Sequence, residues 1–224
     1  MPTPKEGYRV KDGTKVPGTT TVIGRFKDSG ALIHWAWNRG KNFPNEPLYA
    51  SRDLAGDVGT YIHDLIEHAV RSQPLPDPPA GMKEENVKQA TSGYEAFMRW
   101  SKRLNLDIAP VEVPLVCECH RFGGTPDAIA LEEDGTLSLL DWKSAKDFYP
   151  DNLIQLAAYM HLWNVNKPET PIKGNILIVR FGKDGADFGH HEFPIAHPKL
   201  AAAWGQFECY RRAYELDRIV SGKA

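Results

Sequence analysis

Residues 137–146 read LSLLDWKSAK, an apolar run that is interrupted by two charged side chains. Its leucines and its tryptophan predict a buried β-strand, yet Asp141 and Lys143 lie within it. Side chains two positions apart on a strand point to the same face of the sheet. Burying an aspartate and a lysine on that face is costly unless they pair with each other or hold an ion.

The segment before this strand predicts a β-hairpin. The turn reads EEDGT (132–136), and a three-residue loop with Gly135 in the left-handed conformation closes many hairpins of this kind. Pairing the first and last residues of the turn places Asp127 directly opposite Asp141 on one face of the sheet. Opposed carboxylates repel each other, and a divalent cation between them turns the repulsion into a binding site. Their hard oxygen atoms suit Mg²⁺ or Mn²⁺.

Lys143 lies on the same face, where its amine would orient a water molecule or neutralise charge on a reacting phosphate. Two other interpretations explain the same residues without a metal. Asp141 and Lys143 would form a buried ion pair, or a shift of register by one residue would turn Asp127 to the other face. The residues by themselves leave these alternatives open.

The rest of the chain predicts an α/β or α+β protein that is built around a mixed sheet. Apolar spacing predicts two helices, 59–71 and 84–104, which the proline-rich segment QPLPDPPAG (73–81) separates. Strand patterns begin at residue 111. The expected order is strands over 111–118, 125–132 and 137–144, a helix over 151–164, strands over 174–181 and 188–193, and a helix over 197–219.

Composition describes an ordinary globular protein of 224 residues, with 42% hydrophobic and 25% charged residues. The net charge of −2 excludes a protein that coats nucleic acid through bulk charge. There is no run of eighteen apolar residues and no secretory signal at the start, so we expect a cytoplasmic protein that has no membrane partner. Cys117, Cys119 and Cys209 form no disulfide framework. The Cys117–His120 spacing is too tight for the usual zinc knuckle, and these are interpreted as ordinary strand and helix residues.

Four ordered motifs resemble the PD-(D/E)XK nuclease superfamily, and more narrowly its RecB-like exonuclease branch, which includes phage and mitochondrial genome maintenance exonucleases. The motifs are GDVGTYIHDLIEH (56–68), GTPD (124–127), DWK (141–143) and QLAAY (155–159). The resemblance implies a restriction-endonuclease-like core: a mixed β-sheet flanked by helices, with an N-terminal helical elaboration. It implies one domain over 1–224, in which 1–110 is mainly helical and carries His63, and 111–224 forms the catalytic sheet core and its flanking helices.

The resemblance also implies a role for each matching position. Asp127 and Asp141 would bind the metal together with the backbone carbonyl of Trp142, and His63 would be a further ligand. Lys143 would position the hydrolytic water and stabilise the pentacovalent phosphate.

The resemblance further implies that Gln155 and Tyr159 hold the DNA backbone. Both are expected on a face of their helix that points away from the core. Four further residues are candidates on weaker grounds. Glu112 and Glu67 are expected near the metal, and Arg52 and Ser144 are expected to contact phosphate. Four aromatic residues could either stack on unpaired bases or fill the core, namely Trp35, Trp37, Phe43 and Tyr61.

The implied activity is metal-dependent DNA exonuclease cleavage that uses one or two Mg²⁺ or Mn²⁺ ions. It would act on DNA ends or single strands in recombination, repair or phage DNA processing, with a phage recombinase or a single-strand-binding protein as a partner. The four cysteines of the iron–sulfur members are absent, and no GxxxxGK(S/T) motif indicates ATP binding. A structure-specific or restriction-like endonuclease and a non-cutting DNA-binding module are the rival functions. The oligomeric state is left open.

Overall fold

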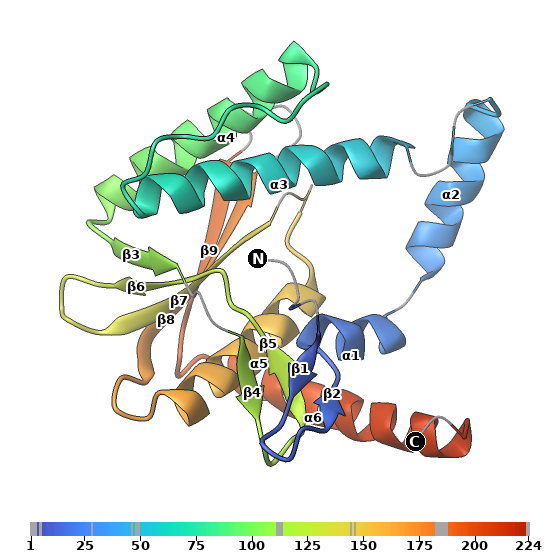
Figure 1. Ribbon diagram of the computed structural model, residues 1–224, viewed down its shortest axis with the longest axis vertical. Coiled ribbons are helices and arrows are strands. Elements are labelled where there is room, and N and C mark those ends of the chain that lie inside the picture. Colours follow the sequence, from blue (N-terminus) through green and yellow to red (C-terminus); the bar gives the residue numbers. More distant parts are fainter. Residues whose placement is uncertain are drawn as a thin grey trace.

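The computed structural model describes residues 4, 6–27, 29–45, 47, 50–110, 114–143, 145, 147–181 and 188–222. Within this part of the chain, five strands form a central sheet in the order β3-β6-β7-β8-β9 (Figure 1). Strands β7 and β8 are parallel, and the other neighbours are antiparallel. The mixed sheet confirms the predicted fold class. The strands are β3 (Asp107–Pro110), β6 (Ala128–Leu131), β7 (Leu137–Lys143), β8 (Ile172–Phe181) and β9 (Phe188–Pro194).

The hairpin between β6 and β7 has the predicted register. Ala128 pairs with Leu140, and the N–H of Glu132 donates to the carbonyl of Thr136 at 2.9 Å. Gly135 has a φ of +80°, the left-handed conformation that the turn requires. Ala128 and Leu140 are the last pair of the ladder at this end. Asp127 and Asp141 lie one residue beyond them on their respective strands.

One face of the sheet is covered by helices α3 (Ala50–Val70) and α4 (Glu84–Arg103), which pack against each other. Ile62 of α3 and Phe97 of α4 are buried with Trp142 and Val179 from the sheet. The rings of Phe97 and Trp142 meet edge to face with centroids 5.6 Å apart. The apolar stripes predicted for both helices thus form this layer, although α3 begins nine residues before the predicted start at residue 59.

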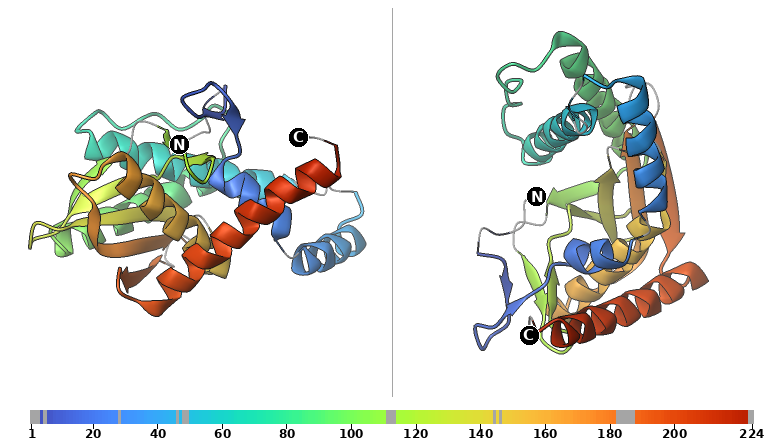
Figure 2. Two further views of the ribbon diagram at one scale, coloured as in Figure 1. Left: turned by 90° about the horizontal axis from the view of Figure 1, so that it is seen from below. Right: turned by 90° about the vertical axis from the view of Figure 1, so that its right-hand side faces the viewer.

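The opposite face is covered by α5 (Pro150–Asn166), α6 (Pro198–Val220) and the short α1 (Thr19–Phe26). Figure 2 shows the two helical layers on either side of the sheet. Leu139 belongs to this second core and Leu140 to the first, because successive side chains of a strand point to opposite faces. A strand that is covered on both faces reads as a nearly continuous apolar run. This explains the run in which Asp141 and Lys143 stand out.

Two smaller sheets lie beside the central one: β1 (Tyr8–Arg9) pairs with β2 (Lys15–Val16), and β4 (Leu115–Cys117) pairs with β5 (Phe122–Gly124). The prediction of a strand over 111–118 was therefore only partly correct. The strand that joins the main sheet before β6 is β3, and β4 forms a separate hairpin. The short DIAP segment of β3 has no strand periodicity that could reveal it.

Helix α2 (Gly30–Asn42) stands away from the body of the molecule between α1 and α3 (Figure 1). Its apolar side chains are exposed: Trp37 is 72% exposed, and Leu32 and Ile33 are exposed as well. Among the helices described, none has a stretch that is both long and apolar enough to cross a membrane.

Candidate active site

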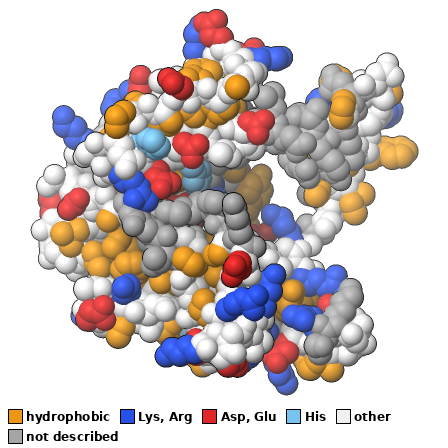
Figure 3. All heavy atoms as spheres, viewed as in Figure 1, with side chains coloured by type: hydrophobic (Ala, Val, Ile, Leu, Met, Phe, Trp, Pro, Cys, Tyr) orange, Lys and Arg blue, Asp and Glu red, His pale blue; other side chains and the backbone are white. Residues whose placement is uncertain are grey.

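The residues expected to act together line one cavity of about 340 Å³ at the end of β7. This cavity lies where the hairpin of β6 and β7 meets α3 on one side and α5 on the other. In Figure 3, acidic, basic and histidine side chains gather below α3 on the face that is shown. The cavity is lined by His63, Asp127, Asp141, Trp142, Lys143, Gln155 and Tyr159, which are seven of the predicted residues.

The two carboxylates occupy the buried wall of the cavity. Asp127 precedes β6, and its Oδ2 accepts a hydrogen bond of 3.1 Å from the N–H of Trp142. Asp141 is only 1% exposed, and its Oδ1 is buried with no hydrogen-bond partner among the described residues. Burial, together with the charge of Asp127 and against the opposing charge of Lys143, raises the pKa of Asp141 to about 6. A buried, unsatisfied carboxylate oxygen of this kind fits a position that contacts a cation.

Lys143 contributes a positive charge to the same wall. Its Nζ lies 2.6 Å from Oδ2 of Asp141. Burial alone would lower the pKa of Lys143, but the charges of Asp141 and Asp127 outweigh it, so that the pKa is raised. The amine is therefore protonated at neutral pH and can donate hydrogen bonds into the cavity.

His63 reaches the carboxylates from α3, in the other helical layer. Its Nδ1 lies 3.9 Å from Oδ1 of Asp127, and its ring meets the Trp142 ring edge to face at 5.4 Å. Burial lowers the pKa of His63 to about 4, so the ring is neutral at pH 7 and offers a lone pair. The backbone of Trp142 opposes this shift and raises the pKa of His63, though by less than burial lowers it.

These groups together fit a divalent cation. Two carboxylates, a neutral imidazole and a backbone carbonyl offer the hard oxygen and nitrogen ligands that Mg²⁺ and Mn²⁺ accept. The buried Oδ1 of Asp141 and the raised pKa of its carboxyl both indicate a charge that nothing in the described protein fully compensates. A bare ion pair between Asp141 and Lys143 would leave this oxygen unexplained.

Gln155 and Tyr159 lie on the opposite wall, one turn apart on α5. Nε2 of Gln155 donates to the Tyr159 hydroxyl at 2.9 Å, so that the hydroxyl hydrogen is available to another acceptor. The expectation that both side chains point away from the core was wrong for Tyr159, which is 6% exposed. Helix α5 is covered by the β4–β5 hairpin and by α6 as well as the sheet, and therefore has a wider buried face than an ordinary surface helix.

The cavity also includes residues that local sequence patterns did not reveal. The hydroxyl of Tyr8 lies 3.3 Å from Oγ1 of Thr125, and Oγ1 of Thr19 donates to the carbonyl of Gly123 at 3.0 Å. Both contacts join positions more than one hundred residues apart in the chain. Only the tertiary structure brings them to the site.

Of the four weaker candidates, only Glu67 has a described side chain. Glu67 pairs with Arg71, at 2.8 Å between Oε1 and the guanidinium, and does not line the cavity. Glu112 and Ser144 lie outside the described residues, and Arg52 lies in α3 with a side chain that is not described. Of the four aromatic residues, Tyr61 is buried, whereas Trp37 and Phe43 are exposed.

The structure adds a fourth residue to Cys117, Cys119 and His120, which the sequence analysis interpreted as ordinary residues. The three side chains lie together, and His161 of α5 joins them from a distant part of the sequence. Cys209 lies apart from this group, exposed on α6. The spacing of the first three residues could not reveal this group, because its fourth member comes from α5.

Sequence comparison with protein families supports the class of protein that this fold and site define. The model of the PD-(D/E)XK nuclease superfamily matches residues 27–217, and the chain belongs to that superfamily. The matched region includes all four motifs and the whole central sheet. A search among curated proteins found no significant match.

Solved structures show more distant similarities. A protein from Eubacterium rectale, to which exonuclease activity is provisionally assigned, is 15% identical over 76% of this chain and 69% of its own, with a TM-score of 0.48. An alkaline exonuclease from Laribacter hongkongensis is 15% identical over 76% of this chain and 92% of its own, with a TM-score of 0.35. The same exonuclease in complex with dAMP is 12% identical, with a TM-score of 0.39.

Proposed function

We propose that this protein is a metal-dependent DNA exonuclease that hydrolyses phosphodiester bonds at DNA ends or in single strands. The observation that carries the proposal is the convergence of Asp127, Asp141 and Lys143 in one cavity, with His63 beside them. Membership of the nuclease superfamily supports phosphodiester hydrolysis. The ordered set of motifs, including the histidine on α3, supports the RecB-like exonuclease branch.

In this proposal Asp127, Asp141, His63 and the carbonyl of Trp142 hold a Mg²⁺ or Mn²⁺ ion. The cation would supply positive charge against the phosphate and lower the pKa of a bound water. Lys143 donates hydrogen bonds to the attacking water and to a phosphate oxygen, and its position 2.6 Å from Asp141 keeps its amine protonated. The water oxygen forms the new bond to phosphorus as it gives up a proton to solvent, and the bond to the 3′-oxygen breaks as that oxygen takes up a proton. The products are a 5′-phosphate and a 3′-hydroxyl.

Gln155 and Tyr159 position the DNA backbone on the opposite wall of the cavity. The Tyr159 hydroxyl accepts from Gln155 and donates its own hydrogen to a phosphate oxygen, while the second N–H of the Gln155 amide is available to the next phosphate. Backbone contacts of this kind hold the strand without selecting its sequence.

Helix α2 supports action on single strands. Trp37 projects its ring into solvent, and Figure 3 shows hydrophobic side chains on the part of the molecule where α2 lies. An exposed aromatic ring can stack on any unpaired base. We further propose that the chain works as one nuclease domain over 1–224 in the cytoplasm of a bacterium or a phage-infected host. Its setting would be recombination, repair or phage DNA processing, beside a phage recombinase or a single-strand-binding protein.

The test compares linear and covalently closed circular single-stranded DNA, with end-labelled duplex DNA as a third substrate, each in Mg²⁺ or Mn²⁺. We expect the linear strand to be shortened from an end while the circle stays intact. Asp127→Asn is the matched inactive variant, because its side-chain oxygen can still accept from the N–H of Trp142. Cutting of the circle would favour the endonuclease, and no metal-dependent cleavage by the wild type would favour the binding module.

A further inference from the structure

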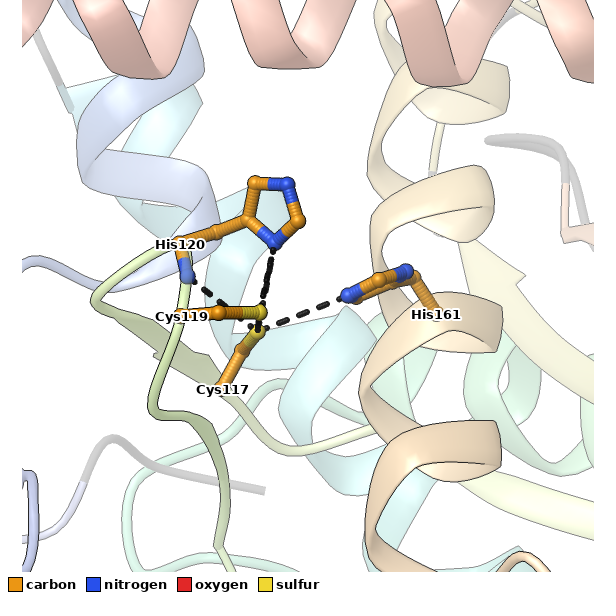
Figure 4. A group of neighbouring side chains, drawn as sticks. All are labelled: Cys117, Cys119, His120 and His161. Atoms are coloured by element: carbon orange, nitrogen blue, oxygen red, sulfur yellow. Dashed lines mark hydrogen bonds between the residues drawn. The ribbon is translucent and has the colours of Figure 1, made fainter.

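A second group of metal-ligating side chains lies outside the candidate active site. Cys117, Cys119, His120 and His161, here called the Cys–His cluster, have ligand atoms that all lie within 4.8 Å of one another. Figure 4 shows both imidazole rings turning a nitrogen toward the two sulfur atoms. Sγ of Cys119 lies 3.1 Å from Nδ1 of His120, and Sγ of Cys117 lies 3.4 Å from Nε2 of His161.

These separations resemble the edges of a metal coordination tetrahedron. Zinc lies about 2.3 Å from sulfur and about 2.0–2.1 Å from nitrogen, so neighbouring ligands of one ion are about 3.3–3.8 Å apart. The two sulfur atoms of the cluster are 3.2 Å apart, and the sulfur–nitrogen distances are 3.1 and 3.4 Å, so two of these three separations are shorter than around a bound ion and the ligands would move apart slightly to admit one. Thiols are weak hydrogen-bond donors, and hydrogen bonds alone give little reason for four such groups to converge. We propose that the Cys–His cluster is a zinc site of the two-cysteine, two-histidine type.

The surroundings of the cluster orient its ligands as metal sites require. His120 turns Nδ1 to the sulfurs, and its Nε2 lies 3.2 Å from Oε1 of Glu208 on α6. A carboxylate on the far nitrogen of a metal-binding histidine fixes its tautomer and makes it a better ligand. The ring of His161 stacks on the Trp204 ring at 4.1 Å and 13°, which holds its direction.

The backbone also supports the sulfur ligands. The N–H of His120 donates to Sγ of Cys117 at 3.5 Å, which holds this sulfur beside the His120 ring. Arg121 closes the turn with a φ of +53°, and its N–H donates to the carbonyl of Cys117 at 2.9 Å. The chain therefore folds back sharply after Cys117, so that three ligands from four consecutive residues can face one point.

The chemistry of the ligands separates this site from the first one. Thiolate and imidazole prefer Zn²⁺, whereas the carboxylates of the candidate active site prefer Mg²⁺ or Mn²⁺. Four protein ligands complete a tetrahedral shell and leave no position for a substrate, which is typical of structural zinc.

The site would connect the β4–β5 hairpin to α5. Helix α5 carries Gln155 and Tyr159, and β5 leads into the segment that ends at Asp127. Zinc would thus stabilise the relative placement of the two walls of the cavity without taking part in the reaction.

The test measures zinc in the protein itself. Wild-type protein that is expressed with zinc and dialysed against a weak chelator should retain about one zinc per chain by elemental mass spectrometry. Cys117→Ser and His161→Asn should lose it. Cys209→Ser is the matched control, because this exposed cysteine lies outside the cluster, and it should retain the metal. Asp141→Asn should also retain zinc, which separates this proposal from the function of the first site.

Cobalt supplies an independent readout. Co²⁺ added to the zinc-free protein should give the visible absorption of a tetrahedral, thiolate-bound ion. Cys119→Ser should abolish this absorption, and because Cys119 is exposed, that variant should fold even if Cys117→Ser does not. The proposal is overturned if the wild type retains no more zinc than Cys119→Ser and shows no such spectrum. A Cys117–Cys119 disulfide in freshly purified protein, found by thiol labelling, would overturn it as well.

Discussion

Replacing Asp141 by asparagine should make the metal-free protein more stable while abolishing cleavage. The wild-type carboxyl is buried, and its pKa is raised from 3.8 to about 6. Each tenfold change in the ionisation constant is worth about 1.4 kcal/mol, so the ionised group costs the folded state about 3 kcal/mol at about pH 8. This value already includes the attraction of Lys143, which opposes the shift. Asn keeps the shape and removes the charge, and the free energy of unfolding should rise by about 1–3 kcal/mol.

The sign of the pH dependence follows from the raised pKa. Between 3.8 and about 6 the folded state binds more protons than the unfolded state, so wild-type stability falls as pH rises through this window. The advantage of Asp141→Asn should therefore be full above about pH 7 and should shrink toward zero near about pH 4.

The assay is urea unfolding in EDTA at several pH values, combined with cleavage of end-labelled DNA in Mg²⁺. Cleavage should fall by about 10²–10³-fold or more, as expected for loss of a charge that stabilises the transition state. Mn²⁺ should stabilise the wild type against urea but not the variant. Asp217→Asn, which changes an exposed aspartate paired with Arg25, should alter neither property substantially. A variant less stable than the wild type at about pH 8 by more than about 1 kcal/mol, or one that cleaves DNA normally, would refute the reasoning.

Three further changes test other parts of the structure. Lys143→Ala should lower the cleavage rate by about 10²–10³-fold yet leave Mn²⁺ binding by calorimetry undiminished; a rate within about tenfold of wild type would contradict this role. Gly124→Ala should destabilise the protein by about 1–3 kcal/mol in urea, because its Cβ would lie 2.5 Å from Cε1 of Tyr159. Gly24→Ala should not destabilise the protein, because its Cβ would have no atom of another part of the chain within 4 Å. Equal losses of stability in the two variants would contradict the packing argument. Trp37→Ala should weaken single-stranded DNA binding by about 1–3 kcal/mol in anisotropy titrations. Leu216→Ala, which also truncates an exposed apolar side chain, should leave the dissociation constant unchanged. An unaltered dissociation constant for Trp37→Ala would argue against stacking.

The hairpin was predictable because its determinants are close together in the chain. A turn with Gly135 in the left-handed conformation sets the register, and the two-residue period of strands then assigns every side chain to a face. The prediction that Asp127 lies near Asp141, just beyond the last pair of the ladder, follows from these two facts alone. The helices α3 and α4 were predictable for a similar reason, since their apolar stripes repeat within each helix.

Burial of a single helix face was harder to predict. The apolar spacing of α5 indicated one core stripe and left Tyr159 on the surface, yet that residue is buried. How much of a helix is covered depends on the number of elements that pack around it, and the sequence of the helix itself does not contain this number. The exposure of Trp37 on α2 is the converse case: the sequence could not tell a stacking surface from a core residue.

The sequence by itself determined the α/β class and the register of the β6–β7 hairpin, because turns and strand patterns depend on near neighbours, and it marked Asp127, Asp141 and Lys143 as candidate site residues. Only the tertiary structure decided that Tyr8 and Thr19 reach the cavity, and that His161 completes a group with Cys117. Such contacts join segments that are separated in the sequence by several helices and strands. Their geometry depends on how the helical layers pack against the sheet, and no local pattern of residues encodes that packing.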